Sequence, residues 1–136
     1  MAISKDFHGG FSRFFDQPTR DTLRDLLKYG SGEANQFDFK EIWPEKHKIA
    51  KHILALANSG GGALIIGVKD NGDLEASGIP PGGKIDKTDV AKQVSAYLPR
   101  SLKFDILDFD YPIDSEYAKI KGKSFQVVIV NCDESE

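Results

Sequence analysis

The sequence contains a single cysteine, Cys132, among its 136 residues. One thiol excludes an intrachain disulfide and a zinc site built from cysteines, and gives no sign of an oxidising compartment. The longest apolar run falls far short of the roughly 18–20 residues that cross a bilayer. The N-terminus also lacks the basic and then apolar pattern of a signal peptide. We therefore expect a cytoplasmic protein with no membrane partner.

Positive charge is also in short supply. The 18 lysines and arginines are outnumbered by 21 acidic residues, which gives a formal net charge of −3. Proteins that bind nucleic acids draw most of their affinity from lysine and arginine side chains that neutralise phosphates. The overall composition therefore does not predict such a function, and any phosphate binding must come from a local basic face.

Length and hydrophobic content limit the number of domains. A chain of 136 residues with 40% hydrophobic content buries one modest core and leaves no room for two independent domains. Residues 1–17 contain four phenylalanines and form an aromatic N-terminal arm, which we expect to dock on the domain or on a partner. Residues 18–136 are predicted to form the single domain.

The stretch from Glu33 to Gly72 carries the clearest pattern. Residues 37–40 alternate phenylalanine with a polar residue, which predicts a short strand with both rings buried. Apolar residues at helical spacing predict a helix over 46–58. Residues 63–68 are nearly all apolar, as in a strand covered on both sides. The polar side of the predicted helix is basic and carries His47, Lys48, Lys51 and His52.

The flanking regions supply the remaining elements. Along the whole chain the expected elements follow the order helix, strand, helix, strand, strand, helix, strand, strand. This order favours an α+β domain, a mixed β-sheet with packed helices. Proline and glycine make residues 78–83 a loop. The other expected elements are a helix over 18–29, a returning hairpin strand over 73–75, a helix from Asp86 or Thr88 to Pro99, and strands over 103–109 and 125–131.

Four sequence features follow one another in fixed order within the central stretch. Glu33 is followed after four residues by Asp38-Phe39-Lys40, then by a helix ending in A-x-A-N-S-x-G-G, an apolar strand and G-V-x-D-x-G. This order resembles the Schlafen-type Alba-like domain, also described as the divergent AAA domain. The resemblance implies the Schlafen Alba-like fold and a DNA-binding role in transcription regulation, with DNA favoured over RNA. In the family the module commonly opens a longer regulator, so further C-terminal domains and a homodimer are compatible with it.

Nucleic-acid binding without chemistry is the first interpretation. It requires no cofactor. Asn58 and the glycines after it allow a backbone to approach closely, and Gly61, Gly62 and Gly67 are expected to be structural. In the alternative interpretation Asn58 caps its own helix and the lysines are only solvated. The candidate phosphate contacts are Lys40, Lys48, Lys51, His52, Arg100 and Lys103.

A metal-dependent endonuclease or endoribonuclease is the second interpretation. Cleavage with magnesium or manganese needs several carboxylates around a hard cation. The candidates are Glu33, Asp38 and Asp70, which match the acidic positions of Schlafen proteins that cut RNA, although the family more often has glutamate at the second. Each also has an ordinary explanation: Glu33 caps a turn, Asp38 pairs with Lys40 or Lys69, and Asp70 is a turn residue.

Nucleotide hydrolysis is the third interpretation, and the sequence argues against it. Residues 78–84 match the pattern G-x4-G-K of a phosphate-binding loop. Pro80 and Pro81 have no N–H groups to offer a phosphate, and Ile85 stands where a hydroxyl should bind magnesium. We therefore expect no ATP binding or hydrolysis.

Overall fold

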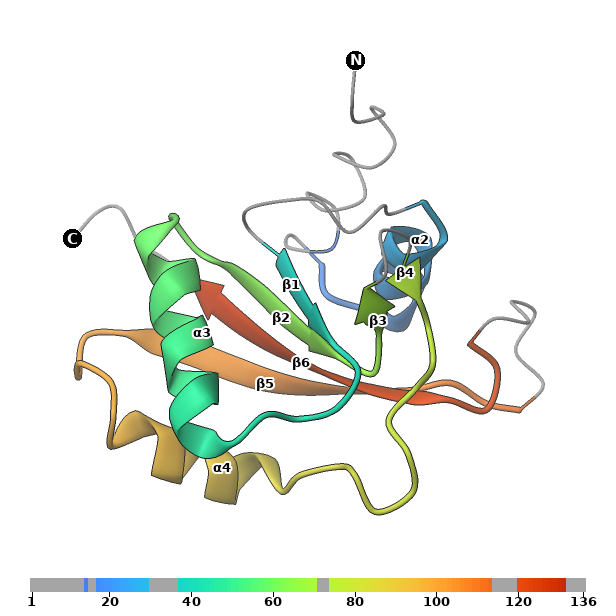
Figure 1. Ribbon diagram of the computed structural model, residues 1–136. Coiled ribbons are helices and arrows are strands. Elements are labelled where there is room, and N and C mark those ends of the chain that lie inside the picture. Colours follow the sequence, from blue (N-terminus) through green and yellow to red (C-terminus); the bar gives the residue numbers. More distant parts are fainter. Residues whose placement is uncertain (1–13, 15–16, 30–36, 71–73, 114–119, 132–136) are drawn as a thin grey trace.

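The computed structural model describes residues 14, 17–29, 37–70, 74–113 and 120–131. It has the predicted α+β architecture, with a mixed four-stranded sheet and a separate two-stranded one (Figure 1). None of its described helices is long and apolar enough to span a membrane. The elements are α2 (Arg20–Tyr29), β1 (Phe37–Lys40), α3 (Lys46–Asn58), β2 (Gly62–Ile66), β3 (Lys69–Asp70), β4 (Leu74–Glu75), α4 (Lys87–Ser95), β5 (Lys103–Asp110) and β6 (Ser124–Asn131).

The main sheet has the strand order β1-β2-β6-β5, so β1 and β5 form its edges. β1 and β2 are parallel, and α3 makes the crossover between them. The pairs β2–β6 and β6–β5 are antiparallel. Val130 is the register partner of both Gly62 and Phe104, so the first residues of β2 and β5 lie at the same end of the sheet.

The two faces of the sheet carry separate apolar clusters. On the α3/α4 face, α3 and α4 cover one set of strand side chains, while on the α2 face α2 and Phe14 cover the other (Figure 1). Residues of β1 alternate between the faces: Phe37 and Phe39 are buried on the α2 face, so Asp38 and Lys40 lie on the α3/α4 face. The predicted burial of both rings is confirmed.

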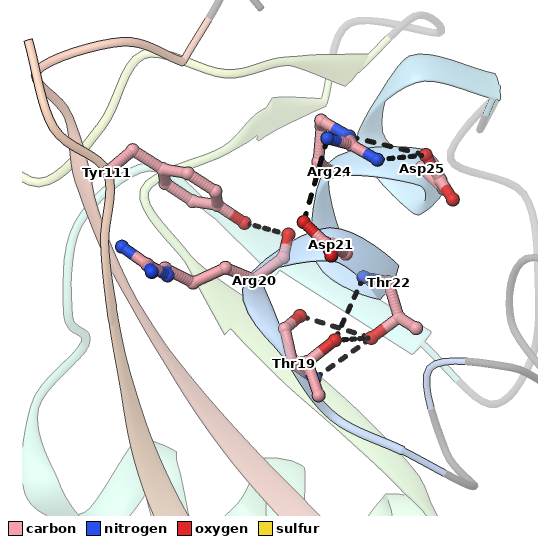
Figure 2. A network of polar contacts seen from close by, with 7 residues as sticks. All are labelled: Thr19, Arg20, Asp21, Thr22, Arg24, Asp25 and Tyr111. Carbon is pink, nitrogen blue, oxygen red and sulfur yellow. Dashed lines mark hydrogen bonds and ion pairs between the residues drawn. The ribbon is translucent and has the colours of Figure 1, made fainter. Parts of the chain in front are cut away.

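α2 is fixed at its N-terminus by reciprocal capping and by contacts with the end of β5. The N–H of Thr22 donates to Thr19 Oγ1 at 3.2 Å, and the N–H of Thr19 donates to Thr22 Oγ1 at 2.9 Å (Figure 2). The Tyr111 hydroxyl donates to the Arg20 carbonyl at 2.6 Å. The Arg20 guanidinium donates in turn to the Asp110 carbonyl at 3.2 Å. These bonds hold α2 on its face of the sheet.

α3 ends in two glycines that use the left-handed backbone region. Gly60 and Gly61 have φ of 95° and 104°. The N–H of Gly60 donates to the Ala57 carbonyl and that of Gly61 donates to the Leu56 carbonyl, which is the hydrogen-bond pattern of a Schellman motif. Gly62 is the first residue of β2. The backbone therefore terminates α3 without help from the Asn58 side chain, which is exposed.

β2 is shorter than the predicted strand over 63–68. It stops at Ile66, and Gly67 turns the chain out of the main sheet with φ of 107°. The N–H groups of Gly67 and Val68 both donate to the Lys40 carbonyl, at 2.8 and 3.1 Å. A Cβ on Gly67 would lie 2.8 Å from the Phe125 ring, so conformation and space both require glycine.

The remaining predicted elements agree closely with the structure. The β3–β4 pair forms the expected hairpin, whose turn lies outside the described residues. α4 begins directly after Asp86, whose carboxylate accepts a hydrogen bond from the Asp89 N–H at 3.0 Å, and it ends at Ser95, before the expected Pro99. Of the aromatic arm, Phe14 is described and is fully buried, with its ring 5.9 Å from that of Phe109.

Candidate nucleic-acid interface

α3 is a basic helix with one apolar side. Its sequence contains three lysines and two histidines and no acidic residue. Ile49, Ala50, Ile53 and Leu56 are buried, so helical spacing directs Lys48, Lys51 and Asn58 outward, and all three are exposed. At 1.5 Å rise per residue this outward row is about 15 Å long.

The lysines of this row differ from three other lysines of the chain, which are paired with carboxylates. Within the described residues, neither Lys48 nor Lys51 forms an ion pair. Three other ammonium groups lie within 4 Å of an acid. These pairs are Lys40–Asp38 at 3.8 Å, Lys84–Asp110 at 3.1 Å and Lys87–Asp108 at 3.2 Å. The outward row of α3 therefore keeps its positive charge available for another molecule.

Asp38 lies between the side chains of His52 and Lys40. Its Oδ2 is 2.9 Å from Nδ1 of His52, and its Oδ1 is 3.8 Å from Nζ of Lys40. Lys40 is one of the two partners that the sequence suggested for Asp38. His52 was not, because that contact depends on the crossover that lays α3 over β1. Asp38, a candidate metal ligand, and Lys40 and His52, candidate phosphate contacts, thus form one cluster at the edge of the sheet.

The proposed acidic trio is only partly within the described residues. Glu33 lies outside them, while Asp70 is exposed in β3, which lies beside β1. No group of three potential metal-ligating side chains occurs in the described part of the chain. Magnesium needs several oxygen ligands, and the Asp38 carboxylate is already engaged by His52 and Lys40. The described residues alone do not fit a metal centre.

The other two candidate cations lie away from β1. Arg100 is exposed in the connection between α4 and β5. Lys103 begins β5, the edge strand opposite β1, and alternation along β5 places it on the α2 face because Phe104 and Ile106 pack on the other. The structure therefore does not gather the six predicted cations into one patch. Lys48 and Lys51 share the α3 row, Lys40 and His52 flank it, and Lys103 faces away.

The loop that matches a phosphate-binding pattern uses its donors internally. The N–H groups of Gly78, Ile79 and Gly83 donate to the carbonyls of Gly67, Ser124 and Pro80. Lys84 pairs with Asp110, whose pKa is held below its usual value by a hydrogen bond from Ser124 and by the nearby Lys84 ammonium. This geometry supports the sequence argument against a nucleotide site.

A buried glutamine supports the α3/α4 face, and the sequence analysis missed it. Gln126 is fully buried, and its Oε1 accepts hydrogen bonds from Trp43 Nε1 at 2.8 Å and from the Ile85 N–H at 3.0 Å. Its Nε2 donates to Asp108 at 2.7 Å and to the Ile85 carbonyl at 3.2 Å. These bonds anchor the segments that precede α3 and α4. A lone glutamine in an otherwise apolar strand was the available signal.

Comparison with known sequences identifies the family. The family model described as "Schlafen, AlbA_2" matches residues 33–136, which include the α3 row and begin after α2. A search of curated proteins found no match. The matched range covers well over half of the chain, and the chain belongs to the Schlafen AlbA_2 family.

Proposed function

We propose that this domain binds nucleic acid through the outward row of α3. Family membership suggests a role related to nucleic acids. The observation that carries the proposal is the pair Lys48 and Lys51, both exposed and both without an ion pair among the described residues, on a helix that has no acidic residue. Phosphate oxygens are the partners that such a row attracts most strongly.

The net charge of −3 does not oppose this proposal. At physiological ionic strength the Debye length is about 8 Å, so exposed charges further away are largely screened. A phosphate at the α3 row therefore interacts chiefly with Lys48, Lys51 and their immediate neighbours. Lys40 and His52 extend the row toward β1, although Asp38 offsets part of the charge of Lys40.

The finer description rests on the family resemblance. It supports DNA as the preferred nucleic acid and a regulatory role. The cytoplasmic location is proposed from the sequence, in which we found no pattern of a signal peptide. Binding by lysine side chains requires no cofactor. A homodimer and further C-terminal domains are also proposed on the basis of the resemblance.

Salt dependence of the affinity tests the proposal. We expect the affinity for a short labelled DNA duplex to fall steeply with salt. The double variant Lys48→Glu/Lys51→Glu should reduce the slope of log affinity against log salt by about one unit per lost phosphate contact, with little dependence on sequence. Lys121→Glu is the matched control, because Lys121 is exposed in the connection that leads into β6, at the sheet end away from Asn58. A double variant that binds like the parent would exclude the α3 row.

Metal-dependent cleavage is the alternative function. The observation that favours it is the position of Asp38 beside Lys40 on the face where α3 would hold a phosphate. A nuclease should shorten a labelled strand in manganese and lose that activity in a chelator, whereas a binding module leaves the strand intact.

A thermal-shift titration of Asp38→Asn separates the two roles of the carboxylate. If acidic residues converge on a metal, manganese should raise the melting temperature of the parent. The variant should then be stabilised without metal and should no longer respond to it. If Asp38 only pairs with Lys40 and His52, the variant should lose under about 1 kcal/mol, and neither protein should respond to manganese.

A further inference from the structure

The connection between α4 and β5, residues 96–102, is fixed by packing and hydrogen bonds, yet it exposes one aromatic and one cationic side chain. Leu98 and Leu102 pack against the cluster on the α3/α4 face. The Leu98 N–H donates to the Ser95 carbonyl, and the Leu102 N–H donates to the Pro99 carbonyl, both at 3.1 Å. Tyr97, just before the first of these leucines, is 60% exposed, and Arg100, between the two, is exposed as well.

This connection lies at the end of the sheet toward which the α3 row runs. The shared register partner Val130 places the start of β2 level with the start of β5. α3 ends just before β2, and the connection ends just before β5, so Asn58 and the connection are at the same end (Figure 1). α3 and α4 also pack against each other. The C-terminal end of the α3 row and Tyr97 therefore lie at one end of the sheet.

Tyr97 adds a chemistry that lysines lack. Among the phenylalanine, tyrosine and tryptophan rings whose burial the structure describes, that of Tyr97 is the only exposed one. An exposed ring stacks on an unpaired base, whereas the bases of a duplex are already stacked on one another. Tyrosine has few rotatable bonds, and its backbone is already fixed here, so little entropy is lost on stacking. Arg100 makes no ion pair with a described residue and is free to contact a phosphate.

We propose that the domain recognises single-stranded nucleic acid, with a base stacked on Tyr97 and a neighbouring phosphate bound by Arg100. This inference rests on the proposed function and names its ligand class. Stacking on a ring does not depend on the sugar, so single-stranded DNA and RNA share the chemistry.

The test compares the affinity of each variant for single-stranded DNA, single-stranded RNA of the same sequence, and duplex DNA. Tyr97→Ala should weaken binding of at least one single strand by roughly five- to a hundredfold and change duplex affinity by less than about twofold. Tyr97→Phe, which keeps the ring, should bind like the parent. Ile113→Ala is the matched control, since Ile113 is an exposed apolar side chain (82%) in the connection after β5. Arg100→Ala should lower the salt slope by about one unit.

The outcomes separate the inference from the proposed function. Unchanged single-strand affinity in Tyr97→Ala, or an equal loss for duplex and single strands, would overturn the inference while leaving the α3 row intact. A parent that binds no nucleic acid would overturn both. A loss confined to DNA or to RNA supports the inference and identifies which strand is bound.

Discussion

α2 and α3 cover opposite faces of one sheet and differ in whether their basic side chains have acidic partners. Arg24 of α2 lies 3.6 Å from Asp21 and 3.4 Å from Asp25 (Figure 2). Arg20 donates to the Asp110 carbonyl of β5. α3 has no acid of its own, and its outward lysines have no carboxylate partner among the described residues. Both helices bury an apolar stripe completely. Both helices therefore cover the sheet, but among their described side chains only α3 presents lysines without an acidic partner.

Truncating the buried stripe of each helix should show that the two are equally structural. Leu26 of α2 and Ile53 of α3 are both fully buried. Leu26→Ala and Ile53→Ala should each lower the free energy of unfolding by about 2–5 kcal/mol, because each leaves a cavity in a packed cluster. Urea denaturation measures both. A loss below about 0.5 kcal/mol for Leu26→Ala would mean that α2, which precedes the family-matched residues, is not part of the cooperative fold.

The docking of α2 should be sensitive to alkaline pH. Burial raises the pKa of Tyr111, whose hydroxyl donates to the Arg20 carbonyl. Folding thus favours the neutral phenol, and its contribution is complete below the ordinary pKa of about 10 and is lost as pH rises above that value.

Tyr111→Phe isolates this effect. It should lower stability at neutral pH by about 1 kcal/mol through the lost hydrogen bond. The stability of the variant should also fall less steeply than that of the parent above about pH 10, because no phenol remains at position 111 to ionise. Denaturant unfolding at neutral and alkaline pH measures both changes. Parallel pH profiles for parent and variant would contradict the docking role of the hydroxyl.

The smallest expected effect belongs to the ion pairs of α2. Arg24→Ala removes contacts to Asp21 and Asp25 that are at least partly open to solvent, so stability should change by at most about 1 kcal/mol. Its affinity for nucleic acid should equal that of the parent, since Arg24 is on the α2 face. An affinity loss as large as that of a single α3 lysine variant would erase the proposed difference between the faces.

Local periodicity predicted the elements that depend on neighbours in sequence. The helical spacing of α3 and the alternation of β1 each gave the correct element and the correct buried side. The break after Ile66 was not predictable in this way, because it depends on the Lys40 carbonyl and on the Phe125 ring, both distant in sequence. Gly67 within the apolar run was the available signal, since a glycine inside a strand often marks a bend.

The same distinction between local and distant contacts applies to the candidate site. Sequence alone gave a basic side for α3, because that side follows from helical spacing. It could not give the contact between His52 and Asp38, which requires the crossover, nor the placement of Lys103 on the other face, which requires the strand order. The side of a single element that carries charged residues was thus predictable from sequence. Which charged residues of different elements lie together was not.

Backbone amide chemical shifts of the isotope-labelled domain, titrated with a short single strand, test the central claim most directly. The account predicts saturable shifts along α3 from Lys46 to Asn58 and around Tyr97 and Arg100, with α2 from Arg20 to Tyr29 unaffected. Shifts concentrated in α2, or a titration that leaves Lys48 and Lys51 unchanged while binding saturates, would contradict it.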